Sequence, residues 1–167
     1  TGTPSASTYL RGDGAWASPS GGGSILLAHA SRATATTSTG TTTTDVLQEI
    51  DATNLSVTFT APANGQVVAY AQGYGYMATG SGLPQLRWGL VTTAGVEVSR
   101  ATVDLSPPTT MTRRQSFRRI ITGLTPGASC TWRLAHTSSD VSLRQPVFRT
   151  DANGATATLE VWSAPTS

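Results

Sequence analysis

The residues that could carry out a reaction are few and scattered. The chain has two histidines, His29 and His136, and one cysteine, Cys130, and their spacing matches no metal-binding motif. No Gly-x-Ser-x-Gly segment marks a serine nucleophile. Glycan hydrolysis usually needs two placed carboxylates, and most of the nine acidic residues adjoin predicted turns. We therefore predict no enzyme, no metal and no cofactor, with both histidines partly buried in strands and Cys130 a buried small side chain.

Binding chemistry is concentrated in one basic cluster, which contains Arg113, Arg114, Arg118 and Arg119. A guanidinium group offers paired donors to a carboxylate or phosphate, so one interpretation is an acidic ligand such as a teichoic or uronic polymer. The other is a solvated sheet edge whose charges discourage pairing with another chain. The sequence favours the edge and leaves the ligand open.

A second candidate is the aromatic alternation within residues 66–77. Tyr70, Tyr74 and Tyr76 share one side of an extended chain, while the other side carries Val67, Ala69, Ala71, Gly73 and Gly75. Such a bare side admits a second sheet or a neighbouring subunit. The tyrosines then fill the core, line an interface between subunits, or form a platform for a sugar ring. Together, the basic and aromatic patterns give Tyr74, Tyr76, Arg113 and Arg114 as candidate ligand-binding residues.

The overall charge argues against nucleic acid as a partner. Only 12% of the 167 residues are charged, the net charge is +2, and all 11 basic residues are arginine. No apolar run reaches the length of a membrane span, and the first residues lack the pattern of a signal peptide. We expect a protein made in the cytoplasm and not inserted into a membrane.

The elements that must position these residues are strands. Leu55, Val57 and Phe59 alternate cleanly on one face, and similar patterns predict strands over residues 25–31, 46–50, 66–77, 85–92, 96–105, 113–122, 147–150 and 155–163, with another around Trp132. Asn64-Gly65 predicts a turn after which the chain returns antiparallel. The polar tract 33–44 is predicted as an edge or surface loop, and residues 77–84, 106–112 and 137–146 as loops.

These strands and the absence of a helical pattern predict an all-β antiparallel sandwich. The length and the long connections favour a jelly roll. We assign residues 25–167 to this sandwich, and residues 1–24 to a connector that ends in the glycine-rich hinge at 18–24.

The connector carries its own pattern. Tyr9, Leu10 and Trp16 are separated by small and turn-forming residues, and Gly12-Asp13-Gly14 allows a tight reversal. One copy of so short a segment would leave these three side chains in water, whereas several copies around one axis could bury them against each other.

This opening segment resembles a known one. TPS at residues 3–5, followed by YLRGDG at 9–14 and Trp16, is similar to a segment that recurs in tail fibres and minor tail proteins of tailed bacteriophages, ahead of a C-terminal receptor-binding domain. Ala15 stands where threonine is more usual. ITGLTPG at 121–127, TWRLAH at 131–136 and LEVW at 159–162 resemble those receptor-binding domains. Leu124 to Gly127 also resembles the corner of fibronectin type III modules, but Cys130 occupies the tyrosine position.

The phage resemblance implies a homotrimer with tumour-necrosis-factor-like heads, in which Tyr9, Leu10 and Trp16 form the trimer interface near the axis. It implies a protein of the virion tail, made in the host cytoplasm and attached to upstream phage tail proteins, that adheres to a bacterial cell-surface glycan. Two alternatives stay open: a structural tail or capsid decoration module that binds no receptor, and a glycan depolymerase.

Overall fold

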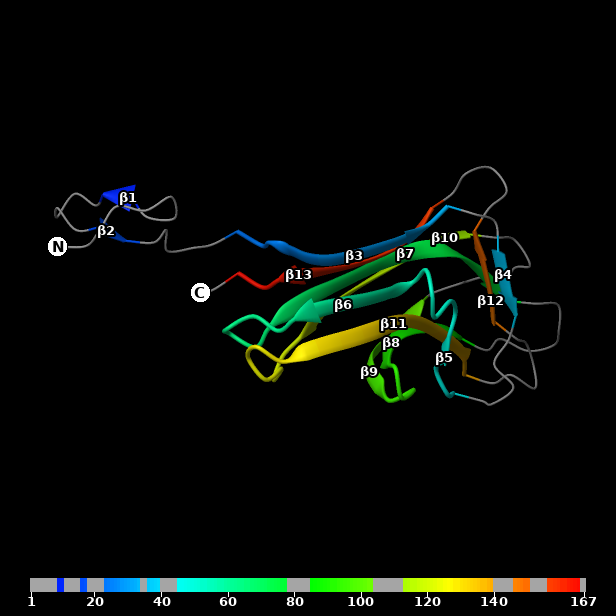
Figure 1. Ribbon diagram of the computed structural model, residues 1–167. Coiled ribbons are helices and arrows are strands. Elements are labelled where there is room, and N and C mark those ends of the chain that lie inside the picture. The colour runs from blue at the N-terminus through cyan, green and yellow to red at the C-terminus, as the bar shows by residue number, and fades with distance from the viewer. Residues whose placement is uncertain are drawn as a thin grey trace.

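The structure is a computed structural model that describes residues 9–10, 16–17, 23–33, 36–39, 45–77, 85–103, 113–139, 146–150 and 156–165. Every regular element in these stretches is a β-strand (Figure 1). The first sheet contains β3 (Leu26–Arg32), β4 (Thr36–Thr39), β7 (Val67–Met77), β10 (Arg113–Ile121), β12 (Pro146–Thr150) and β13 (Ala157–Ser163). The second contains β5 (Gln48–Glu49), β6 (Ser56–Thr60), β8 (Leu86–Thr92), β9 (Glu97–Val103) and β11 (Ser129–Ser138). Across these stretches, no helix is available to span a membrane.

Both sheets are antiparallel and each is built around one long strand. In the first sheet β10 pairs with one edge of β7, while β13 and β12 share its other edge and extend to β3 and β4. In the second sheet β11 lies between β8 and the pair β5 and β6, and β9 borders β8. From β6 onward the chain passes repeatedly between the two sheets, so the fold is the predicted antiparallel jelly-roll sandwich.

The core lies between the two sheets. Leu55, Val57 and Phe59 are buried as predicted, and the Phe59 ring meets Trp132 edge to face with centroids 4.7 Å apart. The bare side of β7 faces this core: Ala69 and Ala71 are fully buried. Their small side chains leave room for large residues of the second sheet, so the predicted second sheet is what covers this side.

The interpretation that the tyrosines of β7 fill the core is wrong for Tyr70 and Tyr74. Both are half-buried on the opposite side of the strand, facing away from the second sheet. The side chain of Tyr76 lies outside the described residues.

The turn at Asn64-Gly65 differs from a simple hairpin. Gly65 has a φ of 62°, as predicted, but β7 returns in the other sheet, because the turn carries the chain across the end of the sandwich. A side chain at Gly65 would bring a Cβ to 2.5 Å from the Leu124 carbonyl oxygen, which belongs to the neighbouring connection between β10 and β11. Glycine is therefore required there by both conformation and space.

Two further predictions need correction, and a third is decided between its two alternatives. The expected alternation over residues 25–31 fails because a register shift opposite Val161 and Trp162 lets Leu27 and Ala28 both pack against the core. Thr137 and Ser138, predicted in a loop, are buried at the end of β11. The polar tract is an edge strand over residues 36–39, as one of its two readings predicted.

The opening segment forms an antiparallel pair of short strands, β1 (Tyr9–Leu10) and β2 (Trp16–Ala17). Leu10 is paired with Trp16 and Tyr9 with Ala17, so the chain reverses over residues 11–15, which lie outside the described residues. The side chains of Tyr9, Leu10 and Trp16 are also outside the description, so their place at a trimer axis stays a prediction. The boundary at residue 24 stays a prediction too, because residues 18–22 of the hinge are not described.

Candidate functional site

The two ends of the sandwich differ in what they carry. The chain enters at β3 and leaves at β13 at the same end, where Ser163 is paired with Val67 at the start of β7 (Figure 1). Short turns close that end, over residues 61–66 and 122–128. The opposite end is where β7, β9 and β11 finish and where β8, β10 and β12 begin.

The three predicted loops all join strands at this opposite end. Residues 78–84 follow β7, residues 104–112 follow β9, and residues 140–145 follow β11; all three lie outside the described residues. The strand ends that hold them are described, and they meet at the end of the sandwich farthest from the chain's entry and exit. Strand pairing therefore brings together the described strand ends that flank these three segments, although they are far apart in the sequence.

The candidate ligand-binding residues lie beside these strand ends. Arg114 on β10 is paired with Tyr74 on β7, and its Nη2 donates to Gln72 Oε1 at 2.5 Å. Gln72 Oε1 also accepts a hydrogen bond from the Tyr70 hydroxyl at 3.2 Å. Arg113 is paired with Gly75, and its side chain, like that of Tyr76, lies outside the described residues. Tyr74 and Arg114 are thus neighbours on one surface. For Arg113, the structure places only the backbone next to this site.

The outer face of the first sheet, defined as the side of β10, β7, β13 and β3 that faces away from the second sheet, carries an apolar row. Ile120, Val68, Trp162 and Leu26 are successive partners across the four strands. Ile120 is 61% exposed and Leu26 43%, whereas Val68 is buried and Trp162 half-buried. The row runs from one edge of this part of the sheet to the other without a hydrogen-bonding group apart from the indole nitrogen.

The next row on the outer face is charged. Arg118, Tyr70, Glu160 and His29 are successive partners across the same strands. Glu160 Oε2 accepts a hydrogen bond from Trp162 Nε1 at 2.9 Å. The Arg118 guanidinium is exposed and makes no hydrogen bond or ion pair within the described part of the chain. Among the described residues, Arg118 therefore presents an unpaired cation beside two aromatic rings.

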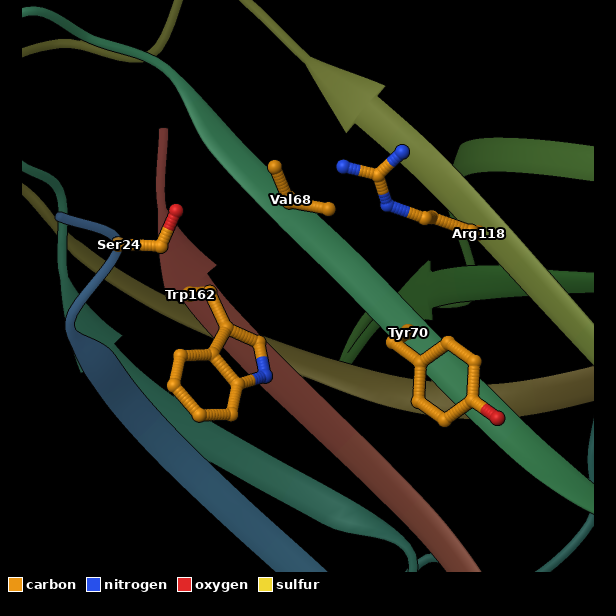
Figure 2. Close-up of a pocket in the computed structure, with 5 residues that line it drawn as sticks. All are labelled: Ser24, Val68, Tyr70, Arg118 and Trp162. Atoms are coloured by element: carbon orange, nitrogen blue, oxygen red, sulfur yellow. The ribbon is translucent and has the colours of Figure 1, made fainter. Parts of the chain in front are cut away.

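A shallow hollow of about 260 Å³ lies where these two rows meet (Figure 2). It is lined by Ser24, Val68, Tyr70, Arg118 and Trp162. Figure 2 shows the rings of Trp162 and Tyr70 on neighbouring strands, with the Arg118 side chain on β10 beyond them. Sequence reasoning had grouped Arg118 with its neighbours but did not single out Trp162, because nothing local indicates that β13 lies beside β7.

The charged side chains on the outer side of the second sheet form ion pairs with one another. Asp45 binds the guanidinium groups of Arg87 and Arg100, and Arg100 also binds Glu97. The hydrogen bond from Arg87 lowers the pKa of the Asp45 carboxyl, and that from Arg100 lowers the pKa of Glu97. A small apolar cluster of Leu47, Val91 and Ala135 covers the neighbouring surface.

The two histidines and the cysteine lie in three different environments. His136 is 1% exposed on β11, and its Nδ1 has no hydrogen-bond partner among the described residues. Burial lowers its pKa to about 4. His29 is exposed on β3, so the prediction that both are partly buried is wrong. Cys130 is half-buried against the core. No group of three His, Cys, Asp or Glu residues within the described stretches could hold a metal ion.

Comparisons with known proteins give distant structural likenesses only. No protein-family model and no curated protein matches the chain. Among solved structures, Eiger TNF from S. frugiperda aligns with a TM-score of 0.41 and 13% identity over 81% of this chain and 91% of its own. The CBM22-1 xylan-binding domain from Paenibacillus barcinonensis Xyn10C aligns with a TM-score of 0.32 and 10% identity, over 90% of this chain and 100% of its own. Arabinose-bound MgGH51 α-L-arabinofuranosidase aligns at 0.36 and 12% identity, over 84% of this chain and 24% of its own. Likenesses at these scores assign no function.

Proposed function

We propose that this chain is the tip of a phage tail fibre, which binds the surface of a host bacterium through a homotrimeric β-sandwich head. The ligand we propose is a cell-surface glycan, and the upstream partner is the phage tail protein to which residues 1–24 connect. The resemblance of residues 3–16 to a segment of phage tail proteins supports the context.

The observation that carries the proposal is that the two ends of the sandwich hold different parts of the chain. Chain entry and exit share one end, and three long connections share the other. A module anchored at one end of a fibre needs its contact surface at the far end, and loops on a rigid sandwich are the usual place for such contacts. Three copies of a weak site on one fibre would bind tightly through avidity.

Residues beside these connections suit a saccharide. Tyr74 is a half-buried aromatic ring, and Arg114, held by Gln72, lies opposite it at the same end. An aromatic ring packs on the apolar face of a sugar, and a guanidinium group binds its hydroxyl, carboxylate or phosphate oxygens.

The test is binding to whole bacteria. The fluorescently labelled chain, residues 1–167, is incubated with a panel of Gram-positive and Gram-negative strains, with an excess of unlabelled chain as competitor. We expect at least one strain to be labelled, with the label displaced by competitor and lost after Tyr74→Ala combined with Arg114→Ala. Absence of labelling of every strain at micromolar concentration would overturn the proposal in favour of a structural tail or capsid module. New reducing ends in purified cell-wall glycan would instead indicate a depolymerase.

A further inference from the structure

The outer face of the first sheet has apolar surface that its own chain does not cover. Ile120 and Leu26 are 61% and 43% exposed at the two ends of the apolar row, with Val68 and Trp162 between them. On the second sheet Leu47, Val91 and Ala135 form a buried cluster, and the exposed apolar residues Val46 and Val96 lie in the connections beside it. The two ends of the row on the first sheet are thus exposed while Trp162 is half-buried and Val68 buried, and apolar surface along one row of a folded domain favours an interaction surface.

The chemistry of this row fits a protein surface better than a sugar. A bound saccharide must hydrogen-bond its hydroxyl groups, and Ile120, Val68 and Leu26 offer no side-chain donor or acceptor. The indole nitrogen of Trp162 is already engaged with Glu160. Another apolar side chain requires no such partner and gains by leaving water.

The neighbouring row carries opposite charges that could pair between two copies of the chain. Among the described residues, Arg118 on β10 is an unpaired cation, and Glu160, two strands away on β13, is an anion whose contact is the neutral indole. Their separation on the sheet gives the outer face two different patches: Arg118 with Ile120, and Glu160 with Trp162. A closed ring of identical copies requires two such complementary patches on each copy.

The spacing of the two patches is matched. Ile120 follows Arg118 by two residues on β10, and Trp162 follows Glu160 by two residues on β13, a rise of about 7 Å in each case. Both strands are antiparallel to β7 and so run in the same direction. Rotation about an axis along the strands preserves that direction, so both pairs can meet at once between neighbouring copies.

We infer that copies of this chain pack through this outer face, with Arg118 of one copy paired with Glu160 of the next and Ile120 against Trp162. The inference rests on the proposed homotrimer and names its interface. It adds to the opening segment, which is too short to bury much surface itself.

The test is a charge exchange read by sedimentation of the full chain. We expect Arg118→Glu and Glu160→Arg each to raise the dissociation constant of the trimer at least about a hundredfold, because each brings like charges together. The double variant, which exchanges the two charges, should restore the trimer. Arg119→Glu is the matched control, because Arg119 faces the other side of β10 and donates to the Arg100 carbonyl oxygen at 3.1 Å. It should leave the trimer intact.

A second variant guards against misfolding. Ile120→Arg alters an exposed side chain and should yield a folded monomer with an unchanged circular dichroism spectrum. If the unaltered chain is a trimer and all of these variants remain trimers, the interface is elsewhere while the proposed function stands. If the unaltered chain is a monomer at every concentration, both fail. Loss of glycan binding by an Arg118→Glu variant that remains a trimer would instead identify the face as a saccharide site.

Discussion

Replacing His136 with leucine should remove a specific pH dependence from the stability of the sandwich. The imidazole is 1% exposed, its Nδ1 has no hydrogen-bond partner within the described stretches, and burial lowers its pKa from 6.5 to about 4. Above pH 6.5 the residue is neutral in both the folded and the unfolded chain. As the pH falls below 6.5 the unfolded chain binds a proton that the folded chain does not, so the free energy of unfolding decreases until about pH 4.

The size of the effect follows from the two pKa values. At about 1.4 kcal/mol per pH unit, the interval from 6.5 to about 4 corresponds to roughly 3 kcal/mol of stability lost through this one group. Asp45 and Glu97, whose pKa values are lowered by their arginine partners, contribute stability that is lost at still lower pH. They are present in the variants as well, so the difference between chains isolates His136.

The assay is urea unfolding followed by tryptophan fluorescence, at one fixed protein concentration, in steps from about pH 7.5 to about pH 4. The unaltered chain should lose roughly 3 kcal/mol more over this range than His136→Leu. His136→Gln, which keeps a polar side chain that does not titrate, should behave like the leucine variant. Parallel pH profiles for all three chains would refute the reasoning.

Three further predictions concern stability, measured by urea unfolding at neutral pH. Gly65→Ala should lower the free energy of unfolding by at least about 2 kcal/mol, because the residue has a φ of 62° and its new Cβ would clash with the Leu124 carbonyl. Gly95→Ala, where φ is 76° and the space is open, should lower it by only about 1 kcal/mol. Equal losses would contradict the clash. Trp132→Ala should cost about 3–5 kcal/mol by emptying the core, and a loss below about 1 kcal/mol would contradict its burial. Asp45→Asn should lower the free energy of unfolding by less than about 1 kcal/mol, because the carboxylate is 44% exposed. The loss should be smaller in about 1 M salt, and a loss that does not depend on salt would rule out an electrostatic origin.

The strands with a strict apolar alternation were the most predictable from sequence. Leu55, Val57 and Phe59 identify β6 and its buried side by themselves, and the small residues of β7 correctly indicate a covering sheet. The burial of His136 was also available from sequence, since it continues the alternation of Trp132 and Leu134. This burial was missed because the predicted strand ended before the polar residues that begin at Thr137.

The pairing of distant strands was not predictable from local pattern. Trp162 lies beside Val68, and Glu160 beside Tyr70, because β13 pairs with β7, although nearly the whole sandwich separates them in the sequence. The outer face therefore appears only in three dimensions. That the three long connections share one end of the sandwich was not predictable for the same reason, because it depends on how β7, β8 and β10 pair with their neighbours.

The homotrimer is the claim on which the fibre-tip account depends, and the mass of residues 1–167 in solution tests it most directly. Light scattering on the eluting peak of a size-exclusion column should give about 52 kDa, three times the 17.3 kDa of one chain. Removing residues 1–24 should weaken this assembly. A mass of 17.3 kDa for the full chain at all concentrations would contradict the account.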